Sequence, residues 1–110
     1  MIEIPIKPLS INQAFQGHRY KTAECKHYEE CLWYLLPKKE KVRGKIHITY
    51  RFFLKNHKMM DIDNLVKVLQ DMIVKKGYIE DDRLIYRMVV EKIPAKSDRI
   101  QIEIKSFDFN

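Results

Sequence analysis

A short acidic stretch, Asp61-Ile62-Asp63-Asn64-Leu65-Val66-Lys67, holds residue types that could do chemistry together. A second acidic group, Glu80-Asp81-Asp82, follows after an apolar segment of helical length. Gathered carboxylates repel one another, so a fold that collects several usually places a cation between them. Mg²⁺ suits such a site because it prefers oxygen ligands and keeps several of its own waters. The pattern therefore indicates a metal site for phosphodiester chemistry, in a chain whose net charge is +6.

Helical spacing predicts how these side chains are presented. A helix is predicted from about Ile62 to Lys76, and at about 100° per residue Asp63, Lys67 and Asp71 share one face. The opposite face is apolar and can anchor the helix in the core; it carries Leu65, Leu69, Met72 and Ile73. Gly77 suits the position just after the helix. We expect residues 78–82 to bring the chain back toward the start of the helix, so that Asp82 joins Asp61 and Asp63.

This arrangement assigns a role to each polar side chain. Asp61, Asp63 and Asp82 are the predicted catalytic carboxylates and metal ligands, with Mg²⁺ bound and Mn²⁺ able to substitute. Lys67 could neutralise the charge that develops on the phosphate in the transition state. Supporting roles beside the ligands, orienting them or holding the lysine, are expected for Asn64, Asp71 and Asp81.

Composition sets the remaining limits. A chain of 110 residues fits one domain, residues 1–110. Its 21 Lys and Arg against 15 Asp and Glu suggest a polyanionic partner, and two basic loops are predicted to contact DNA phosphates. Those loops contribute His18, Arg19, Lys21, Lys55 and Lys58. No membrane-spanning stretch or signal peptide is expected, and the two cysteines are expected to be reduced, which favours a cytoplasmic protein without a membrane partner.

The elements that must position the site follow from hydrophobic periodicity. An α+β fold is predicted, a small mixed β-sheet with two main helices packed on it, in the order β-α-β-α-β-β. The last two strands are expected to pair as a hairpin, and Trp33 is expected in the core or at an interface. The predicted strands are 2–6, 46–54, 84–93 and 99–105, and the predicted helices are 22–36, with Thr22 as N-cap, and 62–76.

The residues of the acidic motif resemble the signature of the RusA family of Holliday junction resolvases. The similar segments are Asp61-Ile62-Asp63-Asn64-Leu65 with Lys67, Leu69-Gln70-Asp71, Glu80-Asp81-Asp82, and the N-terminal Pro8-Leu9-Ser10-Ile11-Asn12. The resemblance implies a homodimeric, Mg²⁺-dependent endodeoxyribonuclease, without a small-molecule cofactor, that nicks four-way DNA junctions symmetrically in recombination and repair. It also implies that Asp61, Asp63 and Asp82 are the catalytic carboxylates and that Lys67 is the family lysine.

Two other classes of function remain open on the sequence alone. Acidic pairs are common as helix caps and turn residues, so the chain could be a non-catalytic DNA-binding or regulatory module whose acids are structural. A Mg²⁺-dependent transferase acting on a nucleotide would also use two nearby aspartates. The chain has only three glycines and no glycine-rich phosphate loop, which argues against the transferase.

Overall fold

The stretch with the strongest strand pattern, Ile46 to Leu54, forms a central strand of a four-stranded sheet. Every second residue of this strand, from Ile46 through Ile48, Tyr50 and Phe52 to Leu54, is fully buried. The computed structural model describes residues 1–17 and 20–108 of the chain. His18 and Arg19, which were predicted to contact DNA, lie outside the described residues.

The predicted α+β order of main elements is confirmed. The strands are β1 (Ile2–Ile4), β2 (Phe15–Gln16), β3 (Tyr20–Lys21), β4 (Ile46–Leu54), β5 (Ile85–Pro94) and β6 (Arg99–Ser106). The helices are α1 (Ile11–Ala14), α2 (Ala23–Leu35), α3 (Lys67–Lys75) and the 3₁₀ turns η1 (His57–Met59), η2 (Ile62–Leu65) and η3 (Asp82–Leu84). The short helix α1 and the small β2–β3 hairpin were not predicted, because both are too short to show a hydrophobic period.

The main sheet has the strand order β1-β6-β4-β5, so the predicted hairpin between β5 and β6 is wrong. Strand β5 pairs in parallel with β4, and β6 pairs antiparallel with the other side of β4. The chain between β4 and β5 contains α3, which makes a β-α-β unit whose two strands are neighbours and run the same way. The turn after β5 then crosses the end of β4, where the Ala95 amide donates to the Leu54 carbonyl at 3.0 Å.

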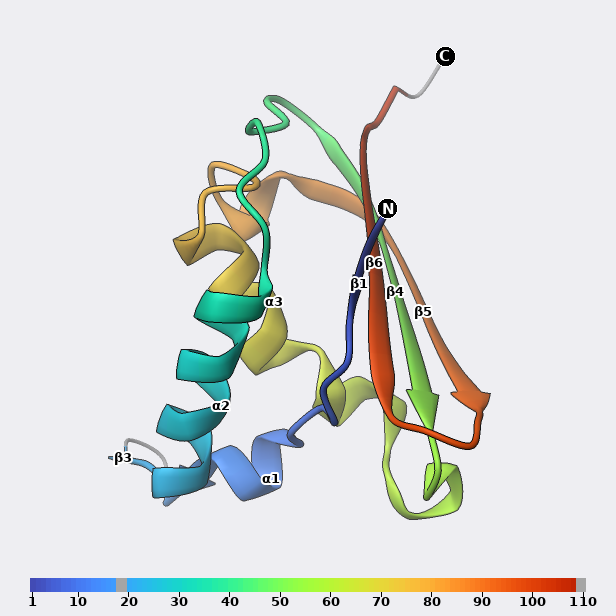
Figure 1. Cartoon of the computed structure of the whole chain (residues 1–110). Helices are drawn as coiled ribbons and strands as arrows, with labels where there is room; N and C mark the ends of the chain where they lie inside the picture. Colours follow the sequence, from blue (N-terminus) through green and yellow to red (C-terminus); the bar gives the residue numbers. More distant parts are fainter. Residues whose placement is uncertain (18–19, 109–110) are drawn as a thin grey trace.

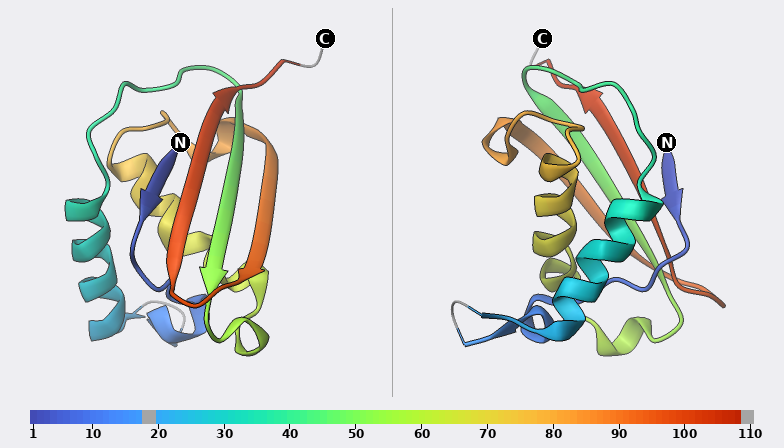
Figure 2. Two further views of the ribbon diagram at one scale, coloured as in Figure 1. Left: turned by 45° about the vertical axis from the view of Figure 1, so that its right-hand side comes forward. Right: turned by 60° about the vertical axis from the view of Figure 1, so that its left-hand side comes forward.

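Helices α2 and α3 pack side by side and cover one face of this sheet, as Figures 1 and 2 show. Thr22 caps α2 as predicted, since its hydroxyl accepts a hydrogen bond from the Cys25 amide. The core between helices and sheet includes Leu32 from α2, Leu69 from α3 and Ile102 from β6, none of which is exposed. Trp33 was expected in the core or at an interface. It is 43% exposed, so it does not lie in the core of the single chain, and Lys76 lies 4.1 Å above its ring.

The segment predicted as one helix from Ile62 to Lys76 is divided in two. It begins as the 3₁₀ turn η2 and continues as α3, which is a common way for a helix to tighten at its start. The apolar face is as predicted, because Leu65, Leu69 and Ile73 are fully buried. At the C-terminal end Gly77 has a φ of +89°, and the amides of Gly77 and Tyr78 donate to the carbonyls of Val74 and Ile73. This pair of hydrogen bonds is a Schellman motif, which ends α3 firmly.

Among the helices of residues 1–17 and 20–108, none has the length and apolar character needed to cross a membrane.

Candidate functional site

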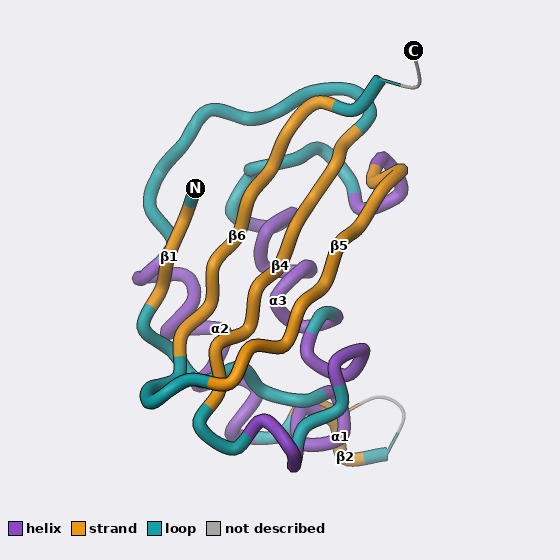
Figure 3. Tube along the Cα trace, turned by 90° about the vertical axis from the view of Figure 1, so that its right-hand side faces the viewer, coloured by secondary structure: helices purple, strands orange, loops and turns teal. Residues whose placement is uncertain are grey.

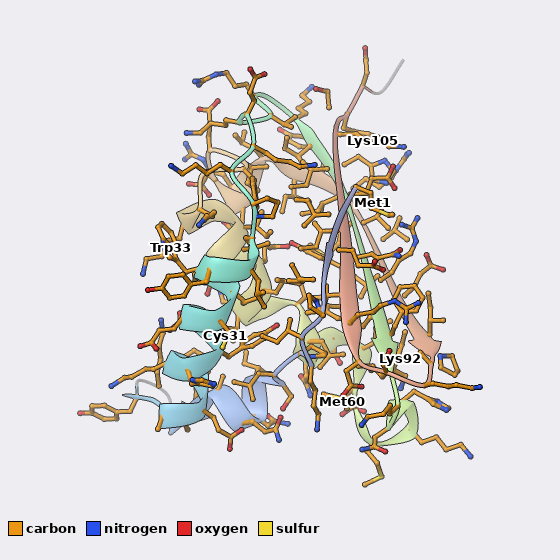
Figure 4. The ribbon with its side chains drawn as sticks, in the orientation of Figure 1. Met1, Cys31, Trp33, Met60, Lys92 and Lys105 are labelled. Carbon is orange, nitrogen blue, oxygen red and sulfur yellow. The ribbon has the colours of Figure 1, made fainter. Side chains whose placement is uncertain are left out.

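The Asp61-to-Lys67 stretch follows the end of β4 and is fixed by contacts on both sides. The Lys92 ammonium of β5 donates to the Met60 carbonyl at 2.8 Å, and both residues are labelled in Figure 4. Four residues beyond Asp61, the fully buried Leu65 ties η2 to the core. The side chains of Asp61 and Asp63, between these two anchors, are exposed. The chain thus holds the backbone of the acidic stretch in place while both carboxylates face solvent.

Asp61 and Asn64 line one polar pocket of about 300 Å³. The opposite wall comes from the N-terminal segment, where Ser10 caps α1 and Gln13 closes a capping box with it. The pocket is lined by Lys7, Ser10, Asn12, Gln13, Asn56, Met59, Met60, Asp61 and Asn64. Asn12 also lines a neighbouring pocket with Lys67. The contribution of Lys7 and Asn12 to this surface was missed, although the Ser10-to-Gln13 capping pattern signalled a short helix there.

Lys67 and Asp71 form an ion pair one turn apart on α3, with Nζ and Oδ1 at 3.2 Å. Their shared helix face was predicted, and so was a role for Asp71 in holding the lysine; the contact confirms the geometry. Lys67 is the first residue of α3, where the positive end of the helix dipole disfavours a cation. The position is therefore poor for helix stability, and the nearby carboxylate compensates for it.

Tyr50 joins α3 to the centre of the sheet. Its hydroxyl donates to Oε1 of Gln70 at 3.1 Å, and its side chain is fully buried. Burial raises the pKa of Tyr50 well above its usual range, and the negative charges of Asp71 and Asp82 raise it further. Tyr50 is thus a neutral donor that ties α3 to the sheet through Gln70, the residue before Asp71.

Asp82 does not return to the start of α3, so that expectation was wrong. Residues 78–80 lie beside the chain that leads into β4: the Val42 amide donates to the Tyr78 carbonyl at 2.9 Å, and Arg43 pairs with Glu80 at 3.5 Å. Asp82 begins η3, directly before β5. Because β4 and β5 are parallel, their starts share one end of the sheet, whereas Asp61 follows the end of β4. Figure 1 shows the two segments at opposite ends of α3.

Asp81 has a local role in the turn before β5. Its side chain caps η3 by accepting a hydrogen bond from the Arg83 amide at 3.0 Å, and this bond lowers the pKa of Asp81. Asp82, its neighbour, is exposed. Of the second acidic pair, Asp82 is therefore the carboxylate available for a ligand.

Within residues 1–17 and 20–108, no group of three or more His, Cys, Asp or Glu side chains is placed to hold a metal ion. The structure puts Asp61, Asp63 and Asn64 on one short segment and keeps Asp82 away from them. The acidic stretch of one chain therefore offers two carboxylates, Asp61 and Asp63, of the hard oxygen type that Mg²⁺ prefers. Asp98, at the same end of the sheet, accepts a hydrogen bond from the Lys55 amide at 2.9 Å.

The basic residues predicted for DNA binding are distributed unevenly. Lys55 and Lys58 are exposed and lie between β4 and Asp61, at the same end of the sheet as the acidic stretch. Lys21 is paired with Glu29 at 2.8 Å, and this hydrogen bond raises the pKa of Lys21. Lys7, on the wall of the Asp61 pocket, is a further cation that the prediction did not include.

Comparison with known proteins places the sequence in a family. The family model described as Endodeoxyribonuclease RusA matches residues 5–105. The chain is 34% identical over 64 residues to a crossover junction endodeoxyribonuclease RusA of Aquifex aeolicus, and 34% identical over 68 residues to the enzyme of that name from Lactococcus phage r1t. The first match covers 57% of this chain and 51% of the relative; the second covers 54% and 52%. The chain therefore spans about half the length of these curated relatives.

Proposed function

Because the chain belongs to the RusA family, we propose that it is a Mg²⁺-dependent endodeoxyribonuclease that resolves four-way DNA junctions by paired, symmetric nicks. The observation that carries this proposal is the exposed Asp61 and Asp63 pair at the entrance to α3, with Lys67 on the adjoining helix turn. These side chains lie inside the matched family segment. The proposal also includes a homodimer, since two identical sites related by a two-fold axis suit a substrate whose strands are paired by a two-fold.

The donor chemistry of the acidic stretch fits a hard divalent cation. Asp61 and Asp63 would hold the ion, and Asn64 beside Asp61 would orient the ligands. A bound Mg²⁺ supplies Lewis acidity toward a phosphate oxygen and lowers the pKa of a water molecule. Lys67 binds a non-bridging phosphate oxygen and offsets the negative charge that grows there as the phosphodiester is attacked. Lys55 and Lys58 bind neighbouring phosphates and hold the strand in register.

The position of Asp82 requires a further element in this proposal. A carboxylate at the start of β5 is separated from Asp61 by the length of the sheet within one chain. In a two-fold dimer the start of β5 from one subunit can meet the end of β4 from the other. We therefore assign Asp82 to the site of the partner subunit, so that each complete carboxylate set contains residues of both chains.

The alternative function is a DNA-binding module whose acids do not catalyse. The observation in its favour is that the described residues of one chain do not assemble three metal-binding side chains. Asp81 also illustrates the structural use of an acid, since it caps η3. The two functions can be told apart by one product, because only the nuclease yields a cut DNA strand.

The test compares a labelled four-way junction with a matched linear duplex, each with Mg²⁺, Mn²⁺ or EDTA. Wild type is expected to nick the junction in pairs with Mg²⁺ and to leave the duplex intact. Asp61→Asn and Asp82→Asn should each bind the junction without cutting it. Junction binding by the wild type without any cut strand, in Mg²⁺ or Mn²⁺, would establish the non-catalytic module.

Mixing the two variants tests the shared site. Co-expressed Asp61→Asn and Asp82→Asn chains form mixed dimers in which one site keeps both carboxylates and the other has lost both. Single nicks from the mixed dimer, with none from either parent, support the assignment of Asp82 to the partner's site. An inactive mixed dimer would mean that each site takes all three carboxylates from one chain, which requires that chain to rearrange.

A further inference from the structure

Strand β5 has an open edge along its whole length. Its inner edge pairs with β4, and among the described residues no strand pairs with its outer edge. Figure 3 shows β5 at the margin of the sheet. The other margin is β1, which is only three residues long and is followed by Pro5. A ten-residue open edge is unusual, because exposed edges invite pairing with another chain and are normally short or covered.

Three exposed side chains of β5 are apolar. Tyr86, Met88 and Val89 are 51%, 39% and 38% exposed. Met88 lies opposite the fully buried Ile48 of β4, so it belongs to the helix-covered face, yet the helices leave it partly uncovered. Val89 lies opposite Thr49 on the other face. Apolar surface is thus available on both faces of the same edge strand.

The charges of β5 suit a second copy of the same strand. In an antiparallel pair centred on Val89, Arg87 of one copy lies opposite Glu91 of the partner subunit, and the two-fold axis generates the same pair again. Met88 then lies opposite Val90 of the partner subunit. In the single chain Arg87 lies 4.5 Å from the ring of Phe107, and Glu91, 50% exposed, pairs with Arg51 of β4 at 3.2 Å. Both side chains would turn from these contacts to pair across the edge.

We propose that the outer edge of β5 is the surface through which two copies of this chain associate, antiparallel and centred on Val89. The two four-stranded sheets then join into one eight-stranded sheet with the helices of both subunits on the same side. This inference names the contact for the homodimer of the proposed function and rests on that function only for the existence of a dimer.

The direction of pairing agrees with a shared site. Antiparallel strands place the start of one β5 beside the end of the other. Asp82 directly precedes the start of β5, and Lys92, near its end, holds the Met60 carbonyl next to Asp61. The acidic segments of two subunits therefore face each other at both ends of the joined strands, whereas a parallel pair would keep them apart.

Sedimentation equilibrium and chemical cross-linking test this edge directly. Arg87→Glu sets two carboxylates opposite each other at two places, and we expect the dimer dissociation constant to rise about tenfold or more. Lys39→Glu, the same charge change at an exposed residue near the β1 margin, should leave dimerisation unchanged. Thermal unfolding of both variants shows that any difference comes from association and not from loss of the fold.

A cysteine at the centre gives a positive signal. Val89→Cys, in a chain also carrying Cys31→Ser, should form a disulfide-linked dimer under mild oxidation, because cross-strand Cβ atoms lie about 4.5–5.5 Å apart. Glu3→Cys on the β1 margin, in the same background, should stay monomeric on a denaturing gel. A wild-type dimer that survives Arg87→Glu and does not cross-link through Val89→Cys would overturn the proposal.

The cleavage assay separates this inference from the proposed function. A dimer that cross-links at Val89→Cys but never cuts a junction supports the interface and contradicts the nuclease. A monomer that cuts junctions in pairs without any association on DNA contradicts the interface and leaves the nuclease intact.

Discussion

Removal of the Asp71 carboxylate should separate the folding role of the Lys67–Asp71 pair from its catalytic role. Both side chains are about half exposed, at 54% and 46%, and exposed pairs one helical turn apart stabilise a helix by only about 0.3–0.5 kcal/mol. The order, lysine before acid, is the weaker one. Asp71→Asn should therefore lower the free energy of unfolding by about 0.5 kcal/mol or less, a shift of roughly 2–4 °C in the unfolding midpoint for a chain of this size.

Cleavage should respond much more strongly than stability. If Asp71 keeps Lys67 beside the reacting phosphate, its loss lets the long lysine side chain sample other rotamers. We expect single-turnover junction cleavage to fall about tenfold or more in Asp71→Asn, which corresponds to about 1.4 kcal/mol of transition-state stabilisation. Lys67→Met should fall at least as far, while its stability should be unchanged or slightly higher, because a cation leaves the positive end of α3.

A double-mutant cycle decides whether the two residues act as one unit. In the Lys67→Met background, Asp71→Asn should change the cleavage rate by less than about twofold. Lys75→Met, the same loss of charge at the far end of the helix, is the matched control and should cleave normally. The reasoning is refuted if Asp71→Asn costs as much cleavage without Lys67 as with it, or if it lowers the free energy of unfolding by more than about 2 kcal/mol.

Three further predictions concern the elements that carry the site. Gln70→Ala should lower the free energy of unfolding by about 1–3 kcal/mol, because it leaves the buried Tyr50 hydroxyl unsatisfied, whereas Tyr50→Phe should lower it by about 0.5–1.5 kcal/mol. Urea denaturation that gives the reverse order would show that this hydrogen bond does not stabilise the fold. Gly77→Ala should cost about 1 kcal/mol or more, since its φ of +89° is unfavourable for any side chain, and calorimetry that finds no loss would show that the helix end relaxes. The free energy of unfolding should be at its full value below pH 10.0, the ordinary pKa of tyrosine, and should fall above it. The reason is that Tyr50 ionises in the unfolded chain, whereas burial keeps it protonated in the folded state. Tyr50→Phe should make the free energy of unfolding depend less on pH in urea titrations between pH 9 and 11, about one unit either side of the ordinary pKa. An unchanged pH dependence would show that other groups cause the loss of stability at high pH.

Local patterns were enough to predict most elements of the fold. The strand β4 and the buried face of α3 follow from alternation and from helical spacing, which depend only on neighbouring residues. Thr22 and Gly77 marked a helix start and a helix end through their own backbone and side-chain chemistry. The contact between Lys67 and Asp71 is of the same kind, because it joins two residues of one helix.

The errors that matter for the site concern residues that are distant in the sequence. Strands β5 and β6 alternate as a hairpin would, and nothing in their residues shows that β4 lies between them. That choice of pairing also decides the place of Asp82, since a strand parallel to β4 must begin where β4 begins. The wall that Lys7 and Asn12 add beside Asp61 depends on the same long-range packing. The metal ligands predicted from the motif, Asp61, Asp63 and Asp82, are not close together in one chain.

The pairing of the first strand with the last has a consequence for synthesis of the chain. Ile2 of β1 lies opposite Ile102 of β6, and β6 is also the strand that joins β1 to β4. During translation β1 therefore has no partner until residues 99–106 leave the ribosome, and the ordering of β1 must wait for nearly the whole chain. Contacts this distant in sequence close the largest possible loop and slow the search for the native sheet. Until then the edge of β4 that pairs with β6 is open, so a chaperone that binds unpaired strands should bind the nascent chain most strongly just before β6 emerges.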